Sequence, residues 1–210
     1  MVHADASAFP SGITKREAYA QLLEQARSLF EGQRNWVWYN LPIPPSFPLT
    51  LIPSFHPTHA HSELTTETAR SNLANAASLL WHMYASLPSP SSAVNWAGFY
   101  VLDPSSPQRQ QLILGPFHGR PACTTIPFTR GVCGAAASTR TTQLVPDVER
   151  FPGHVACDGA TRSEVVVPIL NAGTCVAVLD VDCAVAAGFD GVDVEGLEGL
   201  ARVLGEGCDF

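Results

Sequence analysis

Positive charge is scarce in this sequence of 210 residues, in which Lys15 is the only lysine and 12 basic side chains face 19 acidic ones. The formal net charge of −7 offers no attractive surface to phosphate backbones or anionic lipids. We therefore expect neither a nucleic-acid partner nor a membrane partner. Charged residues make up only 15% of the chain and hydrophobic residues 46%, which is enough to bury one large core. A single domain over 1–210 is the prediction.

A targeting segment is also missing, because residues 1–10 contain neither a basic leader nor an apolar run long enough for a signal peptide or a membrane span. This predicts a location in the cytoplasm or the nucleus. Thiols stay reduced there, so the six cysteines are expected to be catalytic or packing residues rather than a structural disulfide framework.

Compact zinc motifs are absent as well. A zinc site built from the cysteines and histidines of the second half is the competing interpretation, but no C-x2-C or H-x3-H pair is present to form a clamp. We therefore expect no bound metal. The residues that such a site would have to use are Cys123, Cys133, Cys157, His118 and His154.

Hydrophobic periodicity predicts two N-terminal helices, over 13–31 and 67–87, with an irregular proline-rich insertion over 32–66 between them. A closing helix is predicted over 193–204. Between the helices, the region that begins at residue 94 alternates between short strand-like runs and turns. The predicted strands are 95–102, 110–116, 122–127, 142–145, 163–170 and 174–182. The predicted class is α+β, with a six-stranded, mostly antiparallel sheet core (94–204) flanked by helices.

Two aspartates near the end of the last strand, Asp180 and Asp182, must share one face because strand side chains alternate. A turn near residues 171–173 would bring Glu164 opposite Asp180 or its neighbour. Two such charges ~4 Å apart repel by roughly 4 kcal/mol near a protein surface. A bound proton, a metal ion or an organic cation would relieve this repulsion, so the cluster is a candidate site. A solvated strand end is the alternative.

Two aromatic residues, Trp96 and Tyr100, lie on one face of the first predicted strand, with Gly98 between them. The missing side chain predicts a recess between two rings, suited to a small ligand with a cation or a methyl group. An ordinary core pair is the alternative interpretation.

The cysteines fall into two groups. Cys175 and Cys183 share the parity of Leu179 and are expected to be buried, whereas nothing around Cys208 indicates chemistry. Cys123, Cys133 and Cys157 lie near turns beside small residues, where sulfur is expected to be accessible.

Two of these cysteines have neighbours that could activate a thiol. A short helix that opens at residues 131–134 should lower the pKa of Cys133, because helix N-terminal amides favour a thiolate. His154 lies three residues before Cys157 and is one candidate to activate it.

Six runs of the second half carry a resemblance to a known family: NWAGFYVL, LILGPFHGRPAC, IPFTRGVCGAAA, TQLVPDVERFPGHVACD, SEVVVPI and AVLDVD. Through them, residues 67–204 resemble the free methionine-(R)-sulfoxide reductases, a family built on a GAF domain. It implies a GAF fold and the thiol-dependent reduction of free L-methionine-(R)-sulfoxide to methionine. The proline-rich insertion over 32–66 departs from the family pattern.

The resemblance also implies roles for individual residues. Cys157 would be the nucleophile that becomes a sulfenic acid, and Cys123 or Cys133 would resolve it as an intramolecular disulfide. The implied substrate-binding and proton-handling acids are Glu164, Asp180 and Asp182, and the implied aromatic border is Trp96 and Tyr100.

The family further implies an external reductant and a common assembly. Thioredoxin, kept reduced by NADPH and thioredoxin reductase, would regenerate the thiols without any bound cofactor, and the protein would be a homodimer. The rival hypotheses are a non-catalytic GAF sensor of a small ligand and a cysteine redox switch.

Overall fold

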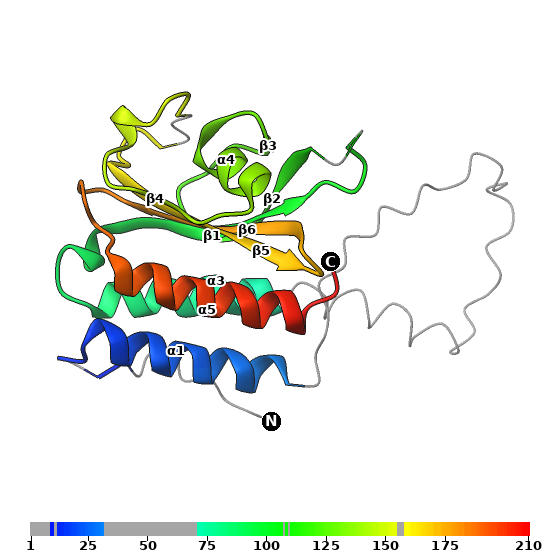
Figure 1. Ribbon diagram of the computed structural model, residues 1–210. Helices are drawn as coiled ribbons and strands as arrows, with labels where there is room; N and C mark the ends of the chain where they lie inside the picture. Colours follow the sequence, from blue (N-terminus) through cyan, green and yellow to red (C-terminus); the bar gives the residue numbers. More distant parts are fainter. Residues whose placement is uncertain (1–8, 11, 32–70, 107, 109, 155–157) are drawn as a thin grey trace, which may run out of the picture.

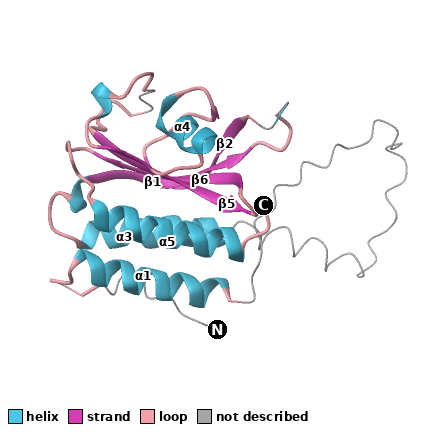
Figure 2. Ribbon diagram, viewed as in Figure 1, coloured by secondary structure: helices cyan, strands magenta, loops and turns pink. Residues whose placement is uncertain are grey.

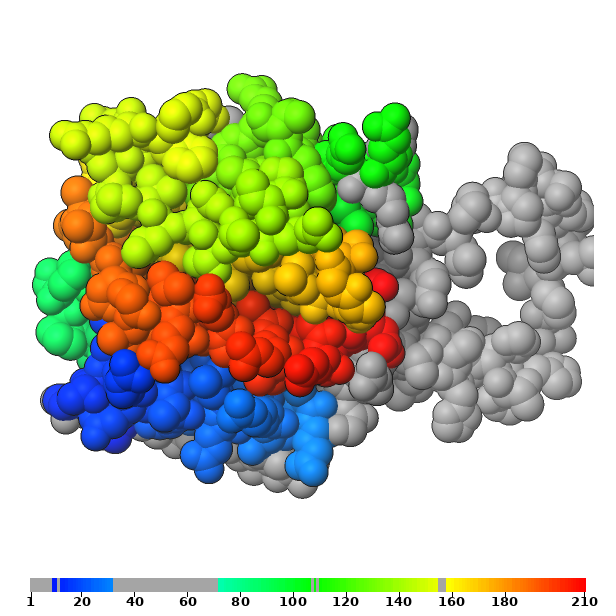
Figure 3. Space-filling view, viewed as in Figure 1, coloured from blue at the N-terminus to red at the C-terminus, as the bar shows by residue number. Residues whose placement is uncertain are grey.

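The computed structural model describes residues 9–10, 12–31, 71–106, 108, 110–154 and 158–210. Three helices cover one face of a twisted sheet. The helix α4 (Gly131–Thr139) and its flanking loops cover the other face (Figure 1, Figure 2). Helices α3 (Ser71–Ser86) and α5 (Gly191–Gly207) pack directly on the sheet, and α1 (Lys15–Phe30) lies outside them. In the space-filling view, α1 and α5 are neighbouring bands on the surface (Figure 3).

The sheet has six strands in the order β3-β2-β1-β6-β5-β4, and every neighbouring pair is antiparallel. The strands are β1 (Val94–Leu102), β2 (Gln111–Gly119), β3 (Thr125–Pro127), β4 (Gln143–Val145), β5 (Ser163–Asn171) and β6 (Thr174–Cys183). The 3-10 turns η2 (Ser91–Ala93) and η4 (Val148–Arg150) precede β1 and follow β4. The predicted α+β class and six-stranded sheet are confirmed.

The predicted helices also form within the described residues. Thr14 and Glu17 make the capping box that begins α1, and Asp190 with Asp193 makes another at the start of α5. The proline-rich insertion over 32–66 and the first residues predicted for the second helix lie outside the described residues. No helix within the described part of the chain combines the length and apolar composition that a membrane span requires.

Two strand boundaries differ from the prediction by three residues, and the others differ by at most one. Strand β2 continues through Pro116 to Gly119, because the pairing with β1 is irregular between Gly98 and Tyr100 and a bulge tolerates a residue without an N–H donor. Strand β3 begins only at Thr125, so Cys123 lies in the loop before it rather than in the strand.

The two sheet faces bury different cores. Alternate residues such as Phe99, Val165 and Leu179 face α3 and α5, whereas Tyr100 and Val166 face α4. Cys183 is buried on the α3/α5 side as expected, and Cys208 is buried there too. The prediction that Cys175 shares this face is wrong: it is buried on the α4 side.

The reason is a register irregularity between Ile169 and Leu170 in the pairing of β5 with β6. An extra residue in one strand reverses the side-chain parity beyond that point. Cys175 therefore packs with Val178 rather than with Ala177.

Candidate functional site

The candidate site lies on the α4-facing side of β1, β6 and β5, where three strands align polar and aromatic residues. Asp182 is opposite Trp96 on one side and Glu164 on the other. One step along the face, Asp180 is opposite Gly98. The register thus brings the three predicted carboxylates together, with Glu164 directly opposite Asp182 rather than Asp180.

These carboxylates are not a solvated strand end. Glu164 and Asp180 each retain only 6% of their exposure, because α4 and its flanking loops cover this part of the sheet. Among the described residues, the only side chain that forms an ion pair with the cluster is His154, whose Nε2 lies 3.5 Å from Oε2 of Glu164. The site therefore carries several buried acids and little positive charge.

Burial is the main reason why the pKa values of these acids are raised. It raises the pKa of Glu164 to about 7, with a contribution from the charge of Asp182 and an opposing one from His154. Burial also raises the pKa of Asp180 well above its ordinary value, and Glu164 adds to the effect. The pKa of Asp182 is raised well above normal by burial and then by Asp180. Neutral carboxyl groups near pH 7 can donate protons.

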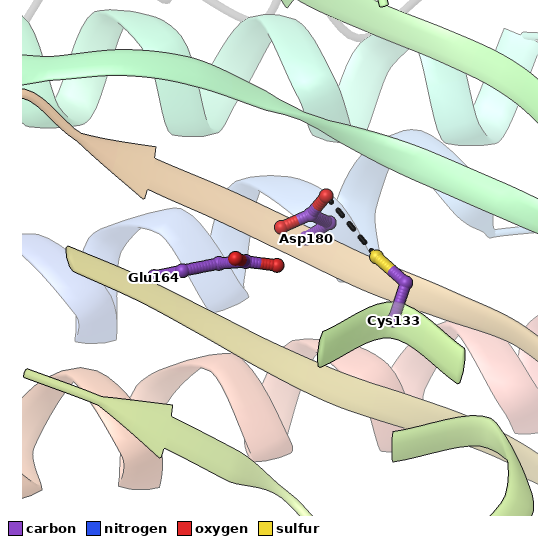
Figure 4. Close-up of side chains that lie close together, drawn as sticks. All are labelled: Cys133, Glu164 and Asp180. Atoms are coloured by element: carbon purple, nitrogen blue, oxygen red, sulfur yellow. Dashed lines mark hydrogen bonds between the residues drawn. The ribbon is translucent and has the colours of Figure 1, made fainter. Parts of the chain in front are cut away.

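Cys133 is the third component of this cluster. Its Sγ–H donates to Oδ2 of Asp180 at 3.2 Å, and Glu164 approaches from the neighbouring strand (Figure 4). The predictions of an accessible sulfur and a lowered pKa are both wrong for Cys133. The side chain is buried, and burial together with the charges of Asp180 and Glu164 raises its pKa well above the usual range. Desolvation and nearby acids outweigh the helix N-terminus.

The aromatic pair shares its face as predicted, but the predicted recess is filled. Trp96 stacks on Tyr100 with ring centroids 5.8 Å apart, and on Phe117 at 5.2 Å. A Cβ added to Gly98 would lie 2.3 Å from Cβ of Phe117 and 2.8 Å from the Trp96 ring. Gly98 therefore permits the rings to close over the strand, and the ligand space lies beside them.

Replacing Gly98 with alanine tests this packing. The new methyl group must displace Trp96 and the Phe117 backbone, so we expect the free energy of unfolding to fall by about 1–3 kcal/mol. Urea denaturation measures the change. Gly159→Ala is the matched control, because a Cβ there would meet nothing within 4 Å. Equal stability of the two variants would show that Trp96 and Phe117 can move to accommodate the methyl group without loss of stability.

A pocket opens beside the acids and the aromatic rings. Its lining includes the three acids, Cys133, His154, Trp96 and Tyr100, together with residues of the β2–β3 loop, β3, the start of α4 and the segment before β5. The lining residues are Trp96, Tyr100, Pro121, Ala122, Ile126, Gly131, Val132, Cys133, His154, Asp158, Thr161, Glu164, Asp180 and Asp182.

Sequence reasoning missed a polar network at the pocket rim. The amide nitrogen of Asn95 donates to Oδ2 of Asp158 and to Oγ1 of Thr161, both at 3.2 Å. Arg120 in the β2–β3 loop forms an ion pair with Asp158 at 3.3 Å. The network joins the loop that carries Cys123 to the residue that follows Cys157. The adjacent Cys-Asp-Gly turn residues were the only local signal for it.

The remaining predicted cysteines separate clearly. Cys123 is disulfide-bonded, whereas Cys133, Cys175 and Cys183 are free thiols. Cys157 lies outside the described residues, so the predicted activation of Cys157 by His154 stays a prediction. The two histidines of the competing zinc set lie at different places. His154 lines the pocket, whereas His118 is not part of its lining and stacks on Trp81.

Chemically, the pocket suits a small ligand with a positive charge and an apolar end. The acids can attract a cation or deliver a proton, and the rings of Trp96 and Tyr100 offer an apolar wall. The indole N–H of Trp96 is buried without a hydrogen-bond partner among the described residues, so it can donate to a ligand oxygen.

Comparison with known proteins gives a consistent set of relatives. The model of the GAF domain family matches residues 15–206. A Saccharomyces cerevisiae protein named free methionine-R-sulfoxide reductase is 44% identical over 99% of this chain and 95% of its own length. A solved structure described as a GAF domain is 42% identical, covers 100% of this chain and 98% of its own, and has a TM-score of 0.79.

A second solved structure bears on the ligand. It is described as the free methionine-R-sulfoxide reductase of Neisseria meningitidis in complex with its substrate. It is 32% identical to this chain, covers 94% of it and 92% of its own length, and superposes with a TM-score of 0.70.

Proposed function

Because this chain belongs to the free methionine-R-sulfoxide reductase family of GAF domains, we propose that its buried acidic pocket binds and reduces free L-methionine-(R)-sulfoxide. The chain is a reductase of this class. The observation that carries the proposal is the pocket in which Glu164, Asp180 and Asp182 meet Trp96 and Tyr100.

The carboxylates account for the preference for a free amino acid. A free amino acid carries an α-ammonium group, which the acids can pair with in a buried setting where the attraction is strong. A peptide-bound residue has an uncharged amide in the same place, so it would leave buried acids without a partner. One of the two aspartates acts as the proton donor, and we assign Glu164 and the other aspartate to the ammonium.

The aromatic wall accounts for the other end of the ligand. The faces of Trp96 and Tyr100 can pack against the methyl group and side-chain methylenes of the substrate. The unpartnered indole N–H of Trp96 can donate to the sulfoxide or carboxylate oxygen.

The chemistry requires a nucleophilic sulfur and a proton. We assign Cys157 as the thiolate that attacks the sulfoxide sulfur while a protonated carboxyl group, Asp180 or Asp182, protonates the oxygen. Methionine leaves, and the oxygen remains on Cys157 as a sulfenic acid. The raised pKa values of both aspartates support their role as proton donors.

We assign Cys123 as the resolving residue. Its thiol condenses with the sulfenic acid of Cys157, which forms the S–S bond and releases water. Two observations favour Cys123 over Cys133: Cys123 is disulfide-bonded, and Cys133 is a buried free thiol whose pKa is raised. A dithiol reductant then exchanges with the disulfide and restores both thiols. We assign that role to thioredoxin, in the cytoplasm, and expect the enzyme to act as a homodimer.

Thioredoxin-coupled NADPH consumption tests the proposal. We expect turnover of free L-methionine-(R)-sulfoxide, and no turnover of the S epimer or of a peptide-bound R sulfoxide. Cys157→Ser should abolish turnover. Cys123→Ser should still yield one equivalent of methionine per chain but accumulate a sulfenic acid that dimedone traps.

The outcomes separate the assignments. A reduced, folded protein that turns over none of these substrates would point to a non-catalytic GAF sensor. Trapping of the sulfenic acid in Cys133→Ser but not in Cys123→Ser would transfer the resolving role to Cys133. Equal rates on free and peptide-bound sulfoxide would refute the ammonium assignment.

A further inference from the structure

We infer that the reduced protein holds one zinc ion in this pocket, bound by Cys133, Glu164 and Asp180 with His154 as the fourth ligand. The ion would occupy the acids that we assign to the substrate and would act as a reversible inhibitor. The inhibition rests on the proposed function, whereas the binding of zinc does not.

The donor atoms are already gathered. One donor atom each from Cys133, Glu164 and Asp180 lies within 4.8 Å of the other two, and all three side chains are buried. The Sγ of Cys133 and Oδ2 of Asp180 are 3.2 Å apart. Ligands at zinc distances of about 2.0–2.3 Å in tetrahedral geometry lie ~3.5 Å apart, so only small shifts are needed.

The fourth donor lies beside this group. Nε2 of His154 is 3.5 Å from Oε2 of Glu164, the separation expected for two ligands on one tetrahedral edge, and the His154 side chain must turn toward Cys133 and Asp180 to complete the set. Three elements supply the set: α4 carries Cys133, the sheet carries both acids, and the segment before β5 carries His154.

One unsatisfied atom points to a missing partner. Oδ1 of Asp180 is buried and has no hydrogen-bond partner among the described residues, and Asp180 is only 6% exposed. Buried polar atoms normally have partners, and a cation that displaces the protons of this acidic cluster would supply one.

The donor types select the metal. A thiolate and an imidazole beside two carboxylates favour zinc over magnesium or calcium, which prefer oxygen ligands alone. On binding, the thiol proton of Cys133 and the protons held by Glu164 and Asp180 are displaced to solvent, so the sulfur binds as a thiolate and both acids bind as carboxylates. No change of oxidation state is involved.

Cobalt and zinc titration of a metal-free protein tests the inference without turnover. A Cys123→Ser/Cys157→Ser background removes the two thiols that could chelate metal by themselves. We expect one equivalent of Co²⁺ to give a thiolate-to-cobalt charge-transfer band with tetrahedral d–d absorption, and one equivalent of Zn²⁺ to bleach both. Adding Cys133→Ser should abolish the charge-transfer band and weaken zinc binding at least a hundredfold. Cys175→Ser is the matched control, since Cys175 is another buried free thiol on this face.

If the Cys133 variant fails to fold, the cobalt spectrum of the Cys123→Ser/Cys157→Ser protein still tests whether a thiolate binds the metal. Absence of a thiolate band at stoichiometric Co²⁺ would overturn the inference, and so would loss of the band in Cys175→Ser with retention in Cys133→Ser. For the otherwise native enzyme, we expect micromolar Zn²⁺ to raise the apparent KM and EDTA to restore it. Metal binding without turnover would leave the metal site standing and refute the proposed function instead.

Discussion

Asp182→Ala is expected to lower kcat/KM for free methionine-(R)-sulfoxide by about 10²–10⁴-fold, the range that general acid catalysis typically contributes. Asp182 lies between Glu164 and Trp96 on the site face, so its loss removes a proton donor or an ammonium ligand. The coupled assay measures the effect. Disulfide formation driven by hydrogen peroxide should be retained, because it needs the cysteines but not the acids.

Asp103→Ala is the matched control for this variant. Asp103 follows β1 and accepts hydrogen bonds from Ser105, at a distance from the pocket, so its replacement should leave kcat/KM unchanged. If Asp182→Ala retained full activity, the protein would be a thiol switch or a reductase whose substrate pairs with other groups.

Glu164→Gln is expected to make the protein more stable at neutral pH. The folded pKa of Glu164 is about 7, above its ordinary value of 4.5. Between these values the folded chain keeps a proton that the unfolded chain has lost, so the free energy of unfolding falls as pH rises through this window. Glutamine has no proton to lose. The variant should therefore gain roughly 3 kcal/mol over the native chain between pH 4.5 and a pH above 7.

Urea denaturation of both proteins at pH 5 and pH 7.5 measures this gain. Glu149→Gln, at an exposed position in η4, is the control and should show no pH-dependent difference. The stabilised Glu164 variant should also bind substrate more weakly, because the ammonium loses a carboxylate. A difference that is constant with pH would mean that Glu164 ionises normally in the folded protein.

Much of this architecture follows from local sequence patterns. Capping boxes and apolar periodicity set α1 and α5, and the two-residue alternation of β1 and β6 placed Trp96 with Tyr100 and Asp180 with Asp182. These features depend on neighbours within a few residues along the chain, so they can be derived without knowledge of the fold. Together with the turn near residues 171–173, they predict that the three acids meet.

Other features depend on groups that are distant in the sequence. The pKa of Cys133 rises because the fold buries its thiol and places it beside Asp180, 47 residues later, whereas the sequence around Cys133 alone indicates the opposite shift. Gly98 was expected to open a recess, but Phe117 from the neighbouring strand closes it. Local sequence predicts the direction of a side chain. Its burial and its pKa depend on every group that the fold brings near, including groups distant in the sequence. Only the tertiary structure therefore decided the chemistry of this pocket.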